Sequence, residues 1–281
     1  MPTGSPTIAI LTQPEDCFEA QGYVLTHLTG YWNRAGYRVD VITDWSRPLD
    51  CDVAILHVDL THVPKPLLDL VRNHPRVLNR KAADISKRQF SRLMVRPGDG
   101  HQGPVIVKTN LNYGGLPEAR MLGLTTWPDE SWGQISFLPP DEYPIFQDPS
   151  QVPREVWNNP ALIVERFVPE RTAEGHFSLR SWLFLGEAGV VWRSLSIHPI
   201  AKAGNAYRHD LLHEVPPEVR EVREAMGLDF GKIDFGFAAG HAVVYDVNKT
   251  PFQSKVTERS QPVLEAMAKA LDAFLDGGRQ P

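Results

Sequence analysis

The stretch that decides the fold lies near the end of the chain and reads Phe230-Gly-Lys-Ile-Asp-Phe-Gly-Phe-Ala-Ala-Gly-His-Ala-Val-Val-Tyr-Asp-Val-Asn-Lys-Thr-Pro251. Residues 232–238 and 241–248 each alternate apolar with polar or small residues, and Gly240 stands between the two runs. Alternation with a period of two and a central glycine predict a β-hairpin.

The second strand of this hairpin has two different faces, because successive side chains of a strand point to opposite sides. One face is apolar and is expected to point to the core: Val243, Tyr245 and Val247. The other face ends in a carboxylate and a carboxamide: Val244, Asp246 and Asn248. Hydrophobic packing gives no reason for this polar pair.

A loop of three residues, 239–241, places Asp234 of the first strand directly opposite Asp246. Opposed like charges destabilise a strand pair, at a Cβ separation of about 4.5–5.5 Å. Two carboxylates and the Asn248 amide oxygen are explained by a hard divalent cation such as Mg²⁺, which takes oxygen ligands. The alternative is a solvent-facing hairpin with ordinary surface aspartates, and the hairpin alone does not decide between them.

Composition indicates a globular protein with ample core. The chain has 281 residues, 42% hydrophobic and 22% charged, and a net charge of −5 without a basic run, which argues against nucleic-acid binding. Apolar runs are too short to span a membrane, and residues 1–6 do not resemble a signal peptide. Cys17 and Cys51 show no metal-ligand spacing and are expected to be reduced thiols in the cytoplasm.

The first part of the chain alternates strands and helices. Strands are predicted at 7–12, 37–42, 52–58 and 76–79, and helices at 15–35 and 65–73. This order predicts a small parallel α/β layer. No G-x-G-x-x-G follows the first predicted strand, so a nicotinamide or flavin site of the usual kind is not expected, and no G-x-x-x-x-G-K-[ST] phosphate loop occurs in the sequence.

A lysine at a strand end is the next polar signal. A helix at 84–95 and a glycine-rich turn precede the strand 104–109, which carries Lys108 and is followed by the glycine loop Asn110-Leu-Asn-Tyr-Gly-Gly115. Backbone N–H groups of such a loop and a neighbouring ammonium can bind phosphate. Alternatively, Lys108 merely caps the strand before a turn.

Segment 119–160 is the least regular part. It contains Trp127, Trp132 and Trp157 and many prolines, including Pro128, which prevent long helices and central strands. A mobile lid, a subunit contact and a wall of an acceptor-substrate site are all open interpretations.

Regular structure resumes after this segment. We predict a strand at 161–168, a hairpin at 178–185 and 190–196, and helices at 216–226 and 257–275. Arg180 and Arg193 interrupt the apolar hairpin, where a charge is costly without a partner. They either snorkel to solvent or bind an anionic ligand.

Taken in order, these segments resemble the ATP-grasp superfamily of carboxylate ligases, and most of all the branch of ribosomal-protein glutamate ligase and glutathione synthetase. The strongest match is Gly231-Lys-Ile-Asp234 with Tyr-Asp246-Val-Asn248-Lys-Thr-Pro251, which parallels the family's G-x-D…E-x-N-x-x-P. The resemblance implies an α/β protein: a Rossmann-like pre-grasp domain at 1–83, and an ATP-grasp domain at 84–281 whose two α+β subdomains sandwich ATP.

The resemblance also implies roles for individual residues. ATP phosphates would be bound by Lys87 and Lys108, under a loop containing Gly114 and Gly115. The adenine hinge would be Arg166, Phe167 and Val168, with Glu165 beside it. Mg²⁺, with Mn²⁺ as an alternative, would be held by Asp234, Asp246 and Asn248. The γ-phosphate and an acyl phosphate would face Arg180 and Arg193.

Two positions depart from the family pattern. Asp246 stands where a metal-bridging glutamate is usual, which puts the two-metal geometry in doubt because Mg²⁺ demands near-ideal octahedral coordination. Ser178 stands where an acidic residue would bind ribose, and Glu170 or Glu174 could substitute for it.

The implied function is ATP-dependent ligation. A carboxylate is activated as an acyl phosphate, with ADP and phosphate as products, and is joined to an amine or similar nucleophile; Lys108, Arg180 and Arg193 would be catalytic. A phosphotransferase and a non-catalytic nucleotide-binding protein are the alternatives. Substrates would be small molecules or peptides, and a homo-oligomer is left open. His57 and Asp59 are candidate walls of the acceptor site, or structural residues.

Overall fold

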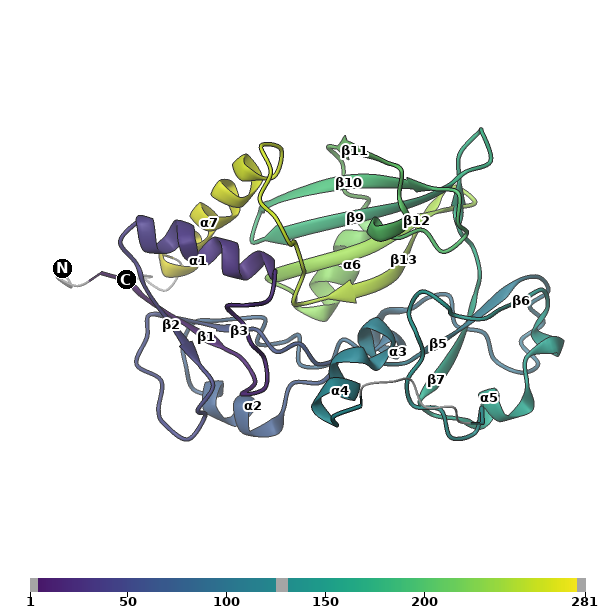
Figure 1. Cartoon of the computed structure of the whole chain (residues 1–281), viewed down its shortest axis with the longest axis horizontal. Coiled ribbons are helices and arrows are strands. Elements are labelled where there is room, and N and C mark those ends of the chain that lie inside the picture. Colours follow the sequence, from purple (N-terminus) through teal and green to yellow (C-terminus); the bar gives the residue numbers. More distant parts are fainter. Residues whose placement is uncertain (1–4, 125–130, 277–281) are drawn as a thin grey trace.

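The computed structural model describes residues 5–124 and 131–276, and Trp127 and Pro128 lie outside these ranges. The described chain forms three β-sheets, which Figure 1 shows at the lower left, the lower right and the top. No helix in these ranges is long and apolar enough to cross a membrane.

The first sheet is the predicted parallel α/β layer. Its strands are β1 (Thr7–Leu11), β2 (Arg38–Ile42), β3 (Val53–Leu56) and β4 (Val77–Leu78), in the order β2-β1-β3-β4. The helices are α1 (Val24–Arg34) and α2 (Lys65–Val71). The helix predicted from residue 15 begins only at Val24, because Tyr23 is extended and forms a β-bridge with Phe252.

The second sheet is small and antiparallel. It contains β5 (Val105–Thr109), β6 (Ile145–Phe146) and β7 (Leu162–Arg166), in the order β6-β5-β7. Short helices surround it: α3 (Lys87–Phe90), η1 (Asn112–Gly115), α4 (Leu116–Met121), η2 (Pro149–Gln151) and α5 (Arg154–Asn158). The helix predicted at 84–95 is only α3, because Ser91 is extended and Val95 donates its N–H to Val164 of β7.

The third sheet is the largest. It contains β8 (Glu170–Arg171), β9 (Phe177–Leu185), β10 (Ala188–Ser196), β11 (Arg208–Leu212), β12 (Phe230–Ala238) and β13 (His241–Asn248). Its order is β11-β10-β9-β12-β13, with β8 also paired to β9. Strands β8 and β11 and helix α4 were not predicted, because they are short and lack alternating apolar residues. Helix α6 (Pro217–Met226) and the short helix η3 (Ala203–Asn205) complete this part.

The core is continuous between the first and third sheets. Helix α7 (Gln261–Asp276) lies beside α1 in Figure 1, and the Trp32 indole donates to the carbonyl oxygen of Ala268 at 2.9 Å. Apolar side chains of β1, β9, α1 and α7 form one buried cluster. The opposite face of β9 packs on α6, through Trp182 and Phe184. The last helix of the chain thus holds the third sheet against the N-terminal layer.

The decisive hairpin has the predicted pairing of Asp234 with Asp246, but a different turn. Ala238 pairs with His241, so the turn has two residues, and Ala239 adopts a φ of 49° there. The register shifts after Asp234 because Tyr245 is an extra residue in β13, a β-bulge. The bulge reverses the faces expected near the turn: Val244, rather than Val243, joins Val247 in the core.

We predict unequal costs for two glycine substitutions at helix ends. Gly36 and Gly227 both have positive φ, but a Cβ at Gly36 meets open space, whereas one at Gly227 would lie 2.4 Å from the Lys81 Cβ. Gly36→Ala should lower the free energy of unfolding by about 1–2 kcal/mol for the left-handed backbone. Gly227→Ala should cost a further ~1–3 kcal/mol for overpacking, measured by urea denaturation. Equal losses of unfolding free energy in the two variants would contradict the packing of Lys81 against the end of α6.

Candidate active site

Three ion pairs form one cluster between the second sheet and the β12–β13 hairpin. Each pair joins a lysine to a carboxylate: Lys87 to Asp246 at 3.4 Å, Lys108 to Glu165 at 2.7 Å, and Lys232 to Asp234 at 2.8 Å. The six residues come from α3, β5, β7, β12 and β13, so residues distant in sequence meet here.

The two aspartates are opposed across the hairpin and share one face of the sheet. Asp234 pairs with Asp246 on one side and with Ser181 of β9 on the other. The Ser181 hydroxyl donates to Asp234 Oδ1 at 2.6 Å. Strand pairing therefore fixes both carboxylates before any ligand binds.

Lys87 reaches this face from α3. Its ammonium is buried and donates to the carbonyl oxygen of Leu111 at 2.5 Å, in addition to its contact with Asp246. Burial lowers the pKa of Lys87, and the Asp246 carboxylate opposes that effect. A buried cation without a full partner set is available to an incoming anion.

Lys108 of β5 lies beside the neighbouring strand β7. Its Nζ is 2.7 Å from Glu165 Oε2, an ion pair without the alignment of a hydrogen bond, and 3.5 Å from the carbonyl oxygen of the bulged Tyr245. Glu165 is only 1% exposed, so Lys108 provides most of the compensation for its charge. The lysine thus links the second sheet to the hairpin.

Lys232 was missed by the sequence reasoning. It lies two residues before Asp234, on the same face of β12, and opposite Asn248. Burial acts to lower the pKa of Lys232, but the neighbouring Asp234 carboxylate outweighs it and raises this pKa. The spacing Lys-x-Asp on a predicted strand was the signal that could have identified it.

The oxygen donors on this face fit a hard divalent cation. They are the carboxylates of Asp234 and Asp246 and the carboxamide of Asn248, whose Oδ1 accepts the Thr250 N–H at 2.7 Å. That hydrogen bond identifies the oxygen end of the carboxamide. Within the described ranges no three His, Cys, Asp or Glu residues form a metal-binding group, so such a site depends on Asn248.

The glycine loop is folded as η1 against the segment that follows it. A Cβ at Gly114 would lie 2.0 Å from the Leu138 carbonyl oxygen, and one at Gly115 would lie 2.6 Å from the Phe137 ring. Both residues have positive φ. Glycine is therefore required here by packing and by backbone conformation, whether or not the loop contacts phosphate.

The predicted hinge connects the second and third sheets. The N–H of Arg166 donates to Leu93 and that of Phe167 to Pro104, both at 2.8 Å. The Val168 carbonyl accepts the Tyr245 hydroxyl at 2.8 Å. These bonds hold the hinge beside the β13 bulge and the ion-pair cluster.

Arg180, Arg193 and Glu170 are not brought to this cluster. Arg180 pairs with Arg193 and Phe235, while its neighbour Ser181 pairs with Asp234, so both arginines lie on the opposite face of the sheet. Arg180 binds Glu170 at 2.8 Å, and Arg193 binds Asp210 at 2.9 Å. The structure therefore does not bring these arginines to the face of Asp234 and Asp246, because adjacent strand residues point to opposite sides.

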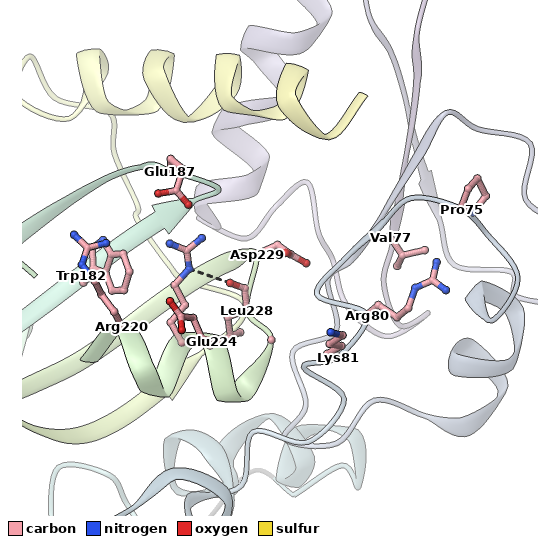
Figure 2. Close-up of a pocket in the computed structure, with 12 residues that line it drawn as sticks. Pro75, Val77, Arg80, Lys81, Trp182, Glu187, Arg220, Glu224, Leu228 and Asp229 are labelled. Carbon is pink, nitrogen blue, oxygen red and sulfur yellow. Dashed lines mark hydrogen bonds between the residues drawn. The ribbon is translucent and has the colours of Figure 1, made fainter. Parts of the chain in front are cut away.

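A pocket of about 540 Å³ lies on that opposite face as well. Figure 2 shows it between Trp182 of β9 and Arg220 of α6 on one side and the chain around Val77 and Arg80 on the other. Trp182 is next to Ser181 in β9 and points away from Asp234. This pocket is therefore separate from the ion-pair cluster.

His57 and Asp59 lie near the carboxyl end of β3. His57 is fully buried between Phe18 and Tyr23, and neither ring nitrogen has a hydrogen-bond partner among the residues that the structure describes. Asp59 accepts the Thr250 hydroxyl at 2.6 Å. His57 thus packs against aromatic rings, and a hydrogen bond connects Asp59 to the segment after β13.

Comparison with solved structures identifies the fold. The ATP-grasp ligase PsnB, solved with a minimal precursor, matches at a TM-score of 0.55 and 12% identity over 96% of this chain and 100% of that chain. The chain has the ATP-grasp fold. D-cycloserine synthetase DcsG matches at a TM-score of 0.54 and 15% identity, over 96% of this chain and 99% of that chain. A RimK-domain ATP-grasp protein from Sphaerobacter thermophilus matches at a TM-score of 0.51 and 13% identity, over 94% of this chain and 98% of that chain.

No family model matches the chain, and no curated protein matches it in sequence. The fold resemblance seen in the sequence is confirmed. The division of the chain into two domains at residues 83 and 84 stays a prediction.

We predict that His57 makes the protein acid-sensitive. Burial, and secondarily Lys249, lowers the pKa of His57 to about 3, whereas an unfolded histidine titrates near 6.5. Between these values the unfolded chain binds an additional proton, so stability falls as pH falls, by up to about 1.4 kcal/mol per pH unit. His57→Leu should flatten this dependence in denaturant titrations from pH 7 to 4.

The exposed His198 provides the control, since His198→Leu should leave the wild-type pH dependence intact. An unchanged slope in His57→Leu would show that His57 takes up its proton in the folded state.

Proposed function

We propose that the protein is an ATP-dependent ligase. It activates a carboxylate as an acyl phosphate, with ADP and phosphate as products, and joins it to an amine or similar nucleophile. The observation that supports this most is the meeting of Lys87, Lys108 and Lys232 with the opposed Asp234 and Asp246 in a chain with the ATP-grasp fold.

The cluster has the charge balance that such a substrate requires. Its three ion pairs contain three lysines and three carboxylates, so their net charge is zero. A triphosphate adds negative charge and a divalent cation adds positive charge, so both can enter by exchange of partners. The lysines would turn to phosphate oxygens while the carboxylates of Asp234 and Asp246 turn to the cation.

Each residue then has a defined task. Lys87 and Lys108 bind phosphate oxygens, and Lys232, beside Asp234, stabilises charge on the group being transferred. Asp234, Asp246 and Asn248 would hold Mg²⁺, or Mn²⁺ as the alternative, and the bound metal would neutralise phosphate charge.

Nucleotide recognition is proposed for the hinge. Glu165 and the backbone of residues 166–168 would contact adenine, and the loop with Gly114 and Gly115 would cover the phosphates. Glu170, which is bound to Arg180, and Glu174 are the two candidates for ribose binding.

The substrate class is proposed from the fold relatives. PsnB was solved with a minimal precursor, and also with that precursor, Mg and ADP. We propose a peptide or small-molecule acid and amine for this chain, and we propose ATP and Mg²⁺ as its cofactors.

Product analysis tests the reaction. The purified protein, ATP and Mg²⁺ are incubated with amino acids and small peptides while ADP release and product mass are followed. We expect ADP only with a suitable acid, and hydroxylamine should trap the activated acyl group. AMP and pyrophosphate would contradict the mechanism. A stable phosphorylated product without an amine would identify a phosphotransferase, and ATP binding without turnover would identify a non-catalytic protein.

Substitutions on the two faces of the sheet test the site. Asp246→Asn should abolish Mg²⁺-dependent turnover, and Lys108→Ala should weaken ATP binding. Lys232→Met should lower kcat by about 10²–10³, the typical effect of losing one charge-stabilising group. Arg193→Met is the matched control on the opposite face and should keep kcat within about threefold, less than one such group contributes. A larger loss of kcat in Arg193→Met than in Lys232→Met would contradict a site on the face of Lys232.

A further inference from the structure

The segment after β13 docks on the N-terminal layer immediately beyond Asn248. The Val24 N–H donates to the Pro251 carbonyl at 2.9 Å, and Tyr23 forms a β-bridge with Phe252. His27 Nε2 lies 2.7 Å from the Gln253 carbonyl oxygen. These contacts, which we call the 251–253 seam, hold the end of the proposed cation-binding strand against the first sheet.

Thr250 connects this seam to Asn248. Its N–H donates to Asn248 Oδ1 at 2.7 Å, and its hydroxyl lies 2.6 Å from Asp59 Oδ1 and 3.2 Å from Asn248 Oδ1. A hydroxyl has a single proton and can donate it to only one of these two oxygens at a time. The shorter contact therefore assigns the proton to Asp59.

This assignment matters because a carbonyl oxygen has two lone pairs. The Thr250 N–H uses one lone pair of Asn248 Oδ1. The Thr250 hydroxyl would take the other if its proton turned away from Asp59. A hydrogen bond there would compete with a cation for the same oxygen.

We propose that Asp59 is a positioning residue that holds the Thr250 hydroxyl proton and so keeps Asn248 Oδ1 open for the divalent cation. This inference rests on the proposed function, because it requires the cation site at Asp234, Asp246 and Asn248.

Asp59 is itself held in place for this task. Its N–H donates to Gln13 Oε1 at 3.1 Å, and the Tyr23 hydroxyl lies 3.3 Å from Asp59 Oδ2 and 3.2 Å from Asp16 Oδ1. Oδ1 is the atom that faces Thr250. The first sheet would thereby determine the cation affinity of a hairpin that belongs to the third sheet.

Mn²⁺ binding in the presence of ADP tests the proposal without activity. Free Mn²⁺ is measured by electron paramagnetic resonance for the full chain, with wild type and Asp246→Asn defining the site. Asp59→Ala should raise the Mn²⁺ Kd about tenfold, as expected for one competing hydrogen bond and for loss of an outer-shell partner.

The decisive comparison removes the hydroxyl as well. Thr250→Val should bind Mn²⁺ within about threefold of wild type, because the N–H bond remains, and Asp59→Ala/Thr250→Val should return to the Thr250→Val value. His27→Ala, which removes one contact of the seam without touching Asn248, should leave the Kd unchanged. Thermal unfolding of each variant reports any general loss of structure.

Other patterns would overturn the proposal. Thr250→Val binding as weakly as Asp59→Ala would mean that the hydroxyl supports Asn248 rather than competing, and this comparison stands even if Asp59→Ala does not fold. Mn²⁺ binding by the double variant that is as weak as that of Asp59→Ala would also mean that the hydroxyl does not compete for Asn248. Mn²⁺ binding that is absent from wild type, or unaffected by Asp246→Asn, would instead defeat the proposed cation site and the inference with it.

Discussion

Two carboxylates, Asp234 and Asp246, are opposed across one strand pair, and the rest of the site is organised around this constraint. Like charges directly opposite each other on paired strands destabilise a sheet unless cations compensate them. Lys232 compensates from the same strand and Lys87 from α3, while Ser181 donates a hydrogen bond from β9. The hairpin thus has an unfavourable electrostatic pairing at its centre that neighbouring elements neutralise.

The same arrangement connects the three sheets. Lys108 extends the cluster into the second sheet, where it pairs with buried Glu165 and approaches the carbonyl of the bulged Tyr245. Thr250 extends it into the first sheet through Asp59. The groups that we propose to bind the nucleotide and the cation therefore lie on separate elements that meet at one face.

The sequence predicted the pairing of Asp234 with Asp246, but through two errors that cancel. The turn has one residue fewer than expected, and the bulge at Tyr245 restores the register. Alternation along one strand cannot reveal a bulge, which depends on the partner strand. Nor can alternation along one strand show which side chains of β9 lie on the same face of the sheet as Asp234 of β12. For that reason Arg180 was expected beside the phosphates, whereas Lys232, two residues from Asp234, was overlooked.

The most direct measurement is a crystal structure of the protein with Mg²⁺ and ADP. We expect the nucleotide to lie between the second sheet and the β12–β13 hairpin. Lys87 and Lys108 should be turned to phosphate oxygens, and the metal should be bound by Asp234, Asp246 and Asn248. Nucleotide bound on the face of Arg180 and Trp182, or bound while the three ion pairs remain intact, would contradict it.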